Sequence, residues 1–233
     1  MNSPFPADIA FVWLEGATGS SRVEALSPGE HTLAAAMGAP RRKEQFALGR
    51  ACAREALRRL GAPPPAEVLR GPGRQPRWPE GYVGSITHSA GRAAAAAAQA
   101  RAYRGVGIDL ERLRQPSAGL LARIARPPER AALEALPPLL LAAALVALFS
   151  AKEALYKAAN PLTGVYLGFQ DAAVRFAPGT AWDGAGGDFA WIVLKDCGPG
   201  FPSGTGGVGR WLRQGDWVLS GAWLAASANP PDA

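Results

Sequence analysis

The chain is poor in the residues that build disulfide frameworks and structural zinc sites. Two cysteines, Cys52 and Cys197, and two histidines, His31 and His88, occur among 233 residues. Two cysteines cannot form a disulfide framework, and so few ligands argue against a structural zinc site. We therefore expect reduced thiols, as in a cytoplasmic protein.

Long apolar runs are also missing. The longest run, residues 139–149, is shorter than the roughly 20 residues that a helix needs to span a bilayer. Residues 1–16 have no basic segment followed by an apolar one, so they do not resemble a signal peptide. These absences predict a cytoplasmic protein with no membrane partner.

Lysine is scarce, with four lysines against 21 arginines. The net charge of +6 comes entirely from residues 1–115, which carry 16 basic and 10 acidic residues, because the remainder carries nine of each. Residues 41–77 are the most basic part, with ten basic and three acidic side chains. This concentration predicts a local anion site rather than a uniformly basic surface.

Hydrophobic periodicity predicts two halves, residues 1–115 and 116–233, joined by a hinge at 115–119. Each half mixes helices with antiparallel strands, which is typical of an α+β fold. The predicted helices span 41–60, 118–125, 127–135 and 138–159. The predicted strands span 8–14, 82–87, 93–102, 105–111, 170–176, 188–196, 209–214 and 217–226.

The segment 93–102 is nearly all alanine, which favours helix by intrinsic propensity. The spacing of the segments and the flanking segments at 82–87 and 105–111 favour a strand instead. We therefore expect a three-stranded meander over these three segments.

Proline and glycine mark the interruptions of the pattern. The helix that begins near 138 is expected to stop before Pro161. Residues 62–80 are expected to form an extended loop, and residues 198–209 a mobile hairpin loop.

The segment 105–111 carries two acids on one face. If it is a strand, its apolar residues share one face, and two glycines, Asp109 and Glu111 share the other. Neighbouring carboxylates repel unless a cation compensates them, and Mg²⁺ accepts one or two carboxylates. The bare glycines would also leave room for a ligand near the backbone. An exposed edge strand with polar residues facing water explains the pattern equally well.

A second cluster lies in FSAKEALYKA, residues 149–158. On a helix, Lys152, Glu153, Tyr156 and Lys157 occupy neighbouring positions. A surface ion pair between Glu153 and Lys157 is the plainer explanation. Two of the four lysines occur here, however, and the following NPLTGVYLGF is unusually apolar for a free surface. Both observations favour a binding site.

The third cluster is GSITHS, residues 84–89, a strand end that enters a hydroxyl-rich turn. Thr87 and His88 can donate hydrogen bonds to a phosphate there, although a histidine bonded to its own turn is the plainer explanation. The chain has no G-x-S-x-G elbow and no Walker A pattern. The G-x-G-x-x-G letters at 204–209 have no room for a βαβ unit and do not indicate a dinucleotide site.

Arginines form the fourth cluster. Arg42 and Arg50 are eight residues apart on the predicted helix 41–60 and so lie near one face, with Arg54 close to it. Arg70 and Arg74 follow in the loop. Guanidinium groups match phosphate oxygens, and a solvated basic face is the alternative.

Together these motifs resemble the 4′-phosphopantetheinyl transferases of the surfactin-synthetase-activating (Sfp) type, nearest the enterobactin and mycobacterial holo-carrier-protein synthases. The family pattern G-[IV]-D-x-E matches residues 107–111, and [WF]-[STC]-x-K-E-[AS]-x-x-K matches residues 149–157. The resemblance covers about residues 40–175. It implies a pseudo-dimeric fold of two similar-sized α+β halves. Residues 70–76 depart from the family's G-K-P or G-E-P, which leaves the role of Arg74 open.

The resemblance implies transfer of 4′-phosphopantetheine from coenzyme A to a serine of an acidic acyl or peptidyl carrier protein. Adenosine 3′,5′-bisphosphate would leave, and Mg²⁺, or Mn²⁺ in its place, would assist. The implied catalytic residues are Glu153, Lys152 and Lys157. The implied metal ligands are Asp109, Glu111 and Glu153. The implied contacts with coenzyme A are Arg42, Arg50, Arg70, Thr87, His88, Asp109, Lys152 and Lys157.

If the active site lies between the two halves of one chain, a single chain can form it, and we therefore expect a monomer. An apolar carrier-docking surface is expected near 118–125 or 162–169, around Leu120 or Tyr166.

Two other functions stay open at this point. A nucleic-acid-binding module would use residues 41–77, but that stretch lacks interleaved aromatics. A non-catalytic coenzyme A-binding protein would not need the acids and lysines of the two motifs. The pathway of the carrier is not indicated.

Overall fold

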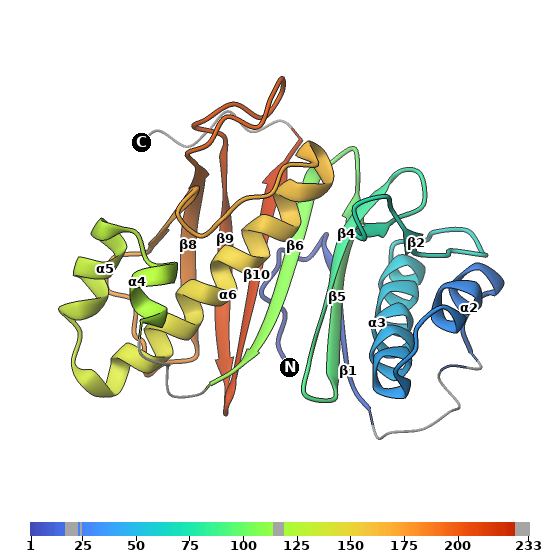
Figure 1. Ribbon diagram of the computed structural model, residues 1–233, viewed down its shortest axis with the longest axis horizontal. Coiled ribbons are helices and arrows are strands. Elements are labelled where there is room, and N and C mark those ends of the chain that lie inside the picture. The colour runs from blue at the N-terminus through green and yellow to red at the C-terminus, as the bar shows by residue number, and fades with distance from the viewer. Residues whose placement is uncertain (17–22, 24, 114–118, 227–233) are drawn as a thin grey trace.

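The computed structural model describes residues 1–16, 23, 25–113 and 119–226, and it confirms an α+β fold with antiparallel sheets (Figure 1). Residues 115–118 of the predicted hinge lie outside the described residues. The helices are α2 (Pro28–Ala35), α3 (Pro40–Arg59), α4 (Leu120–Ile124), α5 (Pro127–Glu134) and α6 (Pro138–Thr163). The strands are β1 (Ala10–Glu15), β2 (Leu69–Arg70), β3 (Pro76–Arg77), β4 (Tyr82–Ser89), β5 (Arg92–Gln99), β6 (Tyr103–Arg112), β7 (Ala172–Phe176), β8 (Gly186–Val193), β9 (Gly206–Gln214) and β10 (Trp217–Ala225).

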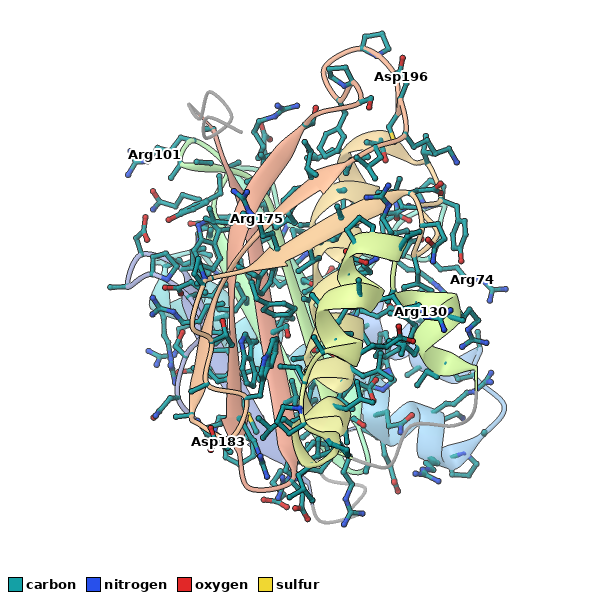
Figure 2. The ribbon with its side chains drawn as sticks, turned by 90° about the vertical axis from the view of Figure 1, so that its left-hand side faces the viewer. Arg74, Arg101, Arg130, Arg175, Asp183 and Asp196 are labelled. Atoms are coloured by element: carbon teal, nitrogen blue, oxygen red, sulfur yellow. The ribbon has the colours of Figure 1, made fainter. Side chains whose placement is uncertain are left out.

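Two main sheets organise the molecule. One has the order β1-β5-β4 and the other the order β6-β10-β9-β8-β7, while β2 and β3 form a short hairpin within the segment expected to be a loop. Helix α3 packs against β5 and β1, and α6 packs against β6 and β10 (Figure 1). Charged side chains such as Arg101, Arg130 and Asp183 lie on the outside (Figure 2). Each main sheet is therefore antiparallel and carries one long helix.

Strand β6 departs from the predicted meander. β4 and β5 pair with each other, but β6 pairs with β10, from Trp217 opposite Arg112 to Ala225 opposite Tyr103. The meander was wrong because the partner of β6 is far away in the sequence, where local spacing carries no information. The predicted boundary at residue 115 thus follows a strand that enters the sheet of the second half.

The alanine-rich segment is confirmed as strand β5. All six alanines from Ala93 to Ala98 are fully buried. Alternate alanines pack toward α3 on one face and toward the core that contains Ile108 of β6 on the other. Burial on both faces overrides the helical propensity of alanine, since small side chains let two layers approach the same strand.

Helix α6 runs through Pro161 to Thr163, so the predicted stop before Pro161 is wrong. Pro161 lies in the last turn, where the lost N–H costs one helical hydrogen bond. The helix ends instead at Gly164, whose φ of 65° is left-handed and whose N–H donates to the Asn160 carbonyl at 2.8 Å.

By length and composition α6 would suffice to cross a bilayer, but 61% of its most apolar window is buried in the structure. Burial of this kind is expected of a core helix.

Helix α6 crosses β6 at very short range. A Cβ atom added to Gly107 would lie 1.8 Å from the Ala154 carbonyl oxygen, and one added to Gly105 would lie 2.4 Å from the Ala158 oxygen. The glycines of β6 therefore admit the backbone of α6 rather than a ligand, which corrects the expectation from the sequence.

This contact is tested by Gly107→Ala. We expect the free energy of unfolding to fall by about 3 kcal/mol, because the new methyl group forces the helix away from the strand. Urea unfolding measures the change. Gly38→Ala is the matched control, since a Cβ there meets nothing within 4 Å, and it should shift stability by no more than about 0.5 kcal/mol. Equal losses in the two variants would contradict the close contact.

Candidate active site

The candidate site lies where the two sheets meet. β4 is an outer strand of one sheet, and β6 is an outer strand of the other. Thr87 comes from β4, Asp109 from β6 and Lys157 from α6, and their polar atoms bond to one another. The fold thus brings together three residues that the sequence analysis took from three separate motifs.

The Asp109 carboxylate is the centre of this group, and the residue is 4% exposed. Its Oδ1 accepts hydrogen bonds from Lys157 Nζ at 2.7 Å and from Thr87 Oγ1 at 3.4 Å. Lys157 Nζ also donates to the Ile108 carbonyl at 3.1 Å. Within the described part of the chain, Asp109 Oδ2 is buried and has no hydrogen-bond partner. A buried acceptor of this kind is available to a ligand or a cation.

Glu153 lies one helical turn before Lys157 on α6. Burial raises the pKa of Glu153, the charge of Asp109 raises it further, and Lys157 opposes both effects. The two carboxylates are therefore close enough to repel each other. Two acids with one unbonded buried oxygen fit a hard divalent cation, which accepts one or two carboxylates.

Glu111 follows Asp109 by two residues on β6 and so shares its face, but it is more exposed than Asp109. Across residues 1–16, 23, 25–113 and 119–226, no three histidine, cysteine or acidic side chains are grouped as a metal site. The charges of Asp109 and Glu153 influence each other, and the participation of Asp109, Glu153 and Glu111 in metal binding stays a prediction.

A basic cavity of about 330 Å³ adjoins this group, between α3, the β2–β3 hairpin and β4. Four guanidinium groups around one cavity fit an anion such as a phosphate. The predicted cluster is therefore assembled in space, and Arg74, whose role was open, lies with it. The charged and titratable lining residues are Arg42, Arg50, Arg70, Arg74 and His88.

Arg50 is the buried arginine of this cavity, with 7% exposure. Its Nη2 donates to the Leu69 carbonyl at 3.2 Å, and its guanidinium lies 4.3 Å from the centre of the Phe46 ring. Burial lowers the pKa of Arg50 to about 10; Glu30 opposes this shift and Arg70 adds to it. Among the described residues Arg50 Nε has no hydrogen-bond partner, so it is free to donate to an anion.

His88 links the cavity to the Asp109 group, because it follows Thr87 directly on β4 and lines the cavity. Its ring reaches solvent, yet the atoms packed on its inner side lower the pKa of His88, and the charge of Lys157 lowers it further. A neutral imidazole offers one N–H donor.

Arg54 does not join the anion cavity. It forms an ion pair with Glu30 of α2, a helix that the sequence analysis missed. Glu30 is fully buried and also accepts the Val68 N–H at 3.2 Å. The signal for α2 was the S-x-x-E capping box formed by Ser27 and Glu30.

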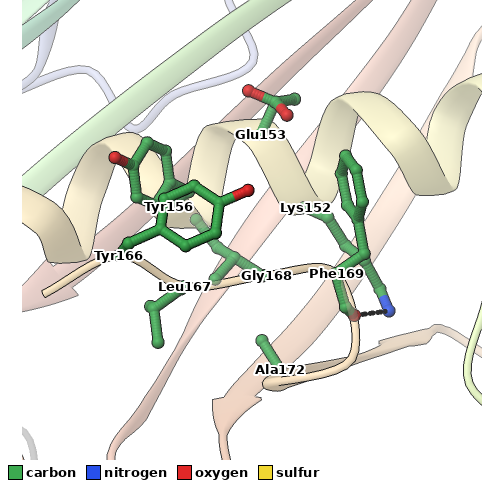
Figure 3. Close-up of a pocket in the computed structure, with 9 residues that line it drawn as sticks. Lys152, Glu153, Tyr156, Tyr166, Leu167, Gly168, Phe169 and Ala172 are labelled. Carbon is green, nitrogen blue, oxygen red and sulfur yellow. Dashed lines mark hydrogen bonds between the residues drawn. The ribbon is translucent and has the colours of Figure 1, made fainter. Parts of the chain in front are cut away.

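A second cavity of about 140 Å³ adjoins Glu153, between α6 and residues 166–172 (Figure 3). The rings of Tyr156 and Tyr166 meet edge-on with centres 5.8 Å apart, and Phe169 lines the same cavity. We call it the tyrosine-lined cavity. The apolar run after Lys157 supplies one of its walls, which explains a composition unusual for a free surface.

Lys152 lines the tyrosine-lined cavity, but its ammonium is bonded inside the protein. Its side chain leaves α6 on a different side from Glu153 (Figure 3) and is 2% exposed. Nζ donates to Glu129 and to the carbonyls of Ile124 and Phe169. An ammonium has three N–H donors, so none remains for the predicted contact with phosphate.

Two family models match the chain. One, described as the 4'-phosphopantetheinyl transferase N-terminal domain, covers residues 30–98. The other, described as the 4'-phosphopantetheinyl transferase superfamily, covers residues 105–193. The 4'-phosphopantetheinyl transferase Npt of Nocardia iowensis is 39% identical over 199 residues, which are 82% of this chain and 85% of the relative. The chain belongs to the 4′-phosphopantetheinyl transferase superfamily.

Other transferases of the superfamily are similar over different shares of their length. Svp of Streptomyces mobaraensis is 38% identical over 196 residues, 83% of this chain and 76% of the relative. PptT of Mycobacterium tuberculosis is 45% identical over 145 residues, and that match spans 62% of this chain and 63% of the relative. The first matched region ends in β5 and the second begins in β6. The candidate site therefore takes Thr87 and His88 from the first region and Asp109 from the second.

The ion pair at the centre of the site is tested by Lys157→Met. We expect the free energy of unfolding to fall by about 2 kcal/mol, because buried Asp109 loses its cation. The loss is smaller than for a fully buried pair since the Lys157 side chain is 26% exposed. Urea unfolding measures it.

Lys195→Met is the matched control, because Lys195 is 44% exposed and 3.9 Å from Asp171. An exposed pair of this kind should contribute no more than about 0.5 kcal/mol. If Lys157→Met is no more destabilising than this control, the pair does not stabilise the site.

Proposed function

We propose that this chain transfers the 4′-phosphopantetheine group of coenzyme A to a serine hydroxyl of an acyl or peptidyl carrier protein. The serine oxygen attacks the phosphorus that carries the pantetheine arm, the pyrophosphate bond breaks, and adenosine 3′,5′-bisphosphate leaves. The observation that carries the proposal is that Glu153 lines the tyrosine-lined cavity, while His88, which follows Thr87 of the Asp109 group, lines the basic cavity. The names of the relatives support the reaction class.

The two cavities suit the two ends of coenzyme A. The nucleotide end carries a 3′-phosphate, which guanidinium groups bind well, so we place it against Arg42, Arg50 and Arg70. The pantetheine arm is neutral and partly apolar, which suits the aromatic lining of the tyrosine-lined cavity. The pyrophosphate between these ends then lies near Lys157 and near Thr87 and His88 of β4, which form part of the strand rather than the expected turn.

The donor set fits a divalent cation, because Asp109 Oδ2 is a buried and unbonded carboxylate oxygen with Glu153 close by. Asp109 and Glu153 would hold Mg²⁺ or Mn²⁺, and Glu111 is the third proposed ligand. When bound, the ion would neutralise charge on the pyrophosphate.

The chain's own residues supply the remaining chemistry. Glu153 is positioned to take the proton of the carrier serine, directly or through a water. Its raised pKa brings its basicity closer to neutral pH, as suits a general base. Lys157 offers positive charge to the leaving phosphate, and the arginines hold the nucleotide in one orientation. Positioning and electrostatics therefore account for most of the proposed catalysis.

The alternative of nucleic-acid binding loses much of its basis in the structure. Arg54 is paired with Glu30, and Arg58 and Arg59 are paired with Glu55. Of the arginines that remain, Arg42, Arg50, Arg70 and Arg74 line one cavity, while Arg41 and Arg77 are exposed and do not line it. Four arginines around one cavity favour a small anion over a polyanion.

For the carrier, we propose docking beside the tyrosine-lined cavity. Tyr166 is 71% exposed and Leu162 is 41% exposed, whereas Leu120 is partly buried. Of the two expected segments, 162–169 therefore presents the exposed apolar side chains next to Glu153.

The transfer is tested by mass spectrometry of apo carrier proteins incubated with coenzyme A and Mg²⁺. We expect the mass of one phosphopantetheine group to be added to at least one type of carrier. Glu153→Gln should lower the rate at least about 100-fold while coenzyme A still binds, because the general base is lost. Asp183→Asn, an exposed acid far from the site in sequence, is the control and should transfer normally. Absence of transfer to every carrier type would refute the function.

Metal binding is tested without turnover. Addition of Mg²⁺ should raise the melting temperature of the wild-type chain, because a ligand that binds only the folded state stabilises it. Glu153→Gln should lose most of that shift, and Asp183→Asn should keep it. Equal shifts in all three proteins would exclude Glu153 as a ligand.

A further inference from the structure

Lys152 and Glu153 are neighbours in the motif, but their side chains serve different parts of the structure. Successive residues of an α-helix differ by about 100° in direction. Glu153 faces the Asp109 side, whereas Lys152 points toward Phe169 (Figure 3). The Lys152 side chain is 2% exposed and that of its partner Glu129 is 8% exposed. This pair is a buried ion pair outside the Asp109 group.

The Lys152 ammonium uses all of its donors inside the protein. Nζ lies 2.7 Å from Glu129 Oε2, 2.7 Å from the Phe169 carbonyl oxygen and 2.9 Å from the Ile124 carbonyl oxygen. Ile124 is the last residue of α4, and Phe169 belongs to the segment after α6. One side chain of α6 therefore holds two segments that do not belong to that helix.

Glu129 extends the same network to two further segments. Its Oε2 also accepts the N–H of Arg126, the N-cap residue of α5, at 2.7 Å, and its Oε1 accepts the N–H of Val174 on β7 at 2.7 Å. β7 is an outer strand of its sheet, so this carboxylate replaces a missing strand partner for Val174. Both carboxylate oxygens and all three ammonium donors are thus satisfied, the condition under which a buried polar network specifies one arrangement.

The network of Lys152 and Glu129 lies next to one wall of the tyrosine-lined cavity. Lys152, Gly168, Phe169 and Ala172 all line the tyrosine-lined cavity. The bond from Lys152 to the Phe169 carbonyl fixes the backbone of this wall relative to α6, which carries Glu153. Loss of either charge would leave the other buried and unpaired, a state that proteins relieve by local rearrangement.

We propose that Lys152 is a positioning residue, which acts through Glu129 to fix the wall formed by residues 168–172 opposite Glu153. It does not bind the phosphates of coenzyme A. This inference rests on the proposed function for its effect on transfer, but the ion pair itself is independent of that function. Glu129, which no motif singled out, has the same role.

The experiment is a double-mutant cycle of Lys152→Met, Glu129→Gln and the two combined. Kinetics of transfer give kcat and KM, calorimetry gives the affinity for adenosine 3′,5′-bisphosphate, and urea unfolding gives stability. We expect each single variant to lower kcat/KM for the carrier at least tenfold. The double variant should lose no more than about threefold beyond the worse single one, since residues that act as one unit are not additive. The affinity for the bisphosphate should change less than twofold in every variant.

Glu134→Gln is the matched control, because it removes the same charge from the same helix. Glu134 pairs with Arg130 on the surface at 2.7 Å, with both side chains about half exposed. It should leave transfer and stability unchanged. If Lys152→Met fails to fold, Glu129→Gln, which keeps the size of the side chain, still reports on the pair.

The outcomes separate the alternatives. A normal Glu129→Gln variant, or a bisphosphate affinity that falls tenfold in Lys152→Met, would overturn the proposal, because Lys152 would then act on phosphate itself. Stability losses that simply add would overturn the ion pair. A wild-type chain without transfer to any carrier would refute the proposed function alone, and non-additive unfolding would then still support the role of the pair in fixing the wall.

Discussion

The buried charge of Asp109 is the constraint on which the arrangement of the site depends. A carboxylate removed from water needs a cation and hydrogen bonds, or it costs several kcal/mol. Lys157 supplies the cation from α6, and Thr87 supplies a hydroxyl from the other sheet. The same pairing uses only Oδ1 and leaves Oδ2 unbonded in the described structure. The interaction that joins both sheets to α6 therefore also leaves an acceptor at the site.

The orientation of α6 decides what each residue of its motif does. Glycines in β6 let the helix approach until its carbonyl oxygens occupy the space of a side chain. At that distance the helix cannot rotate without a clash, so Glu153 stays on the Asp109 side and Lys152 on the side of Glu129. The family motif thus combines an acid at the site with a lysine whose partners are all internal.

The basic stretch of the sequence is divided in a similar way. Some of its arginines are neutralised by nearby acids, as Arg54 is by Glu30 and Arg58 is by Glu55. Others keep their charge around one cavity, where burial even lowers the pKa of Arg50. A broad excess of positive charge becomes a local anion site because the acids that accompany it are placed outside the cavity.

Much of the site was predictable because its residues lie in local patterns. Alternation placed Asp109 on a strand, helical spacing put Glu153 and Lys157 on one side of a helix, and eight-residue spacing aligned Arg42 with Arg50. These are properties of neighbouring residues, which a sequence displays directly. The sequence analysis missed α2, although the capping box of Ser27 and Glu30 is a local signal for it.

The amino-acid sequence alone determined the kinds of element, the acidic strand, the lysine-bearing helix and the family that they resemble. Only the tertiary structure decided that β6 pairs with β10, that glycines of β6 receive α6, and that Lys152 faces Glu129. The reason is physical. The energies of burial and of strand pairing depend on which residues, distant in the sequence, come into contact. Those contacts form only when the sheets and helices pack together.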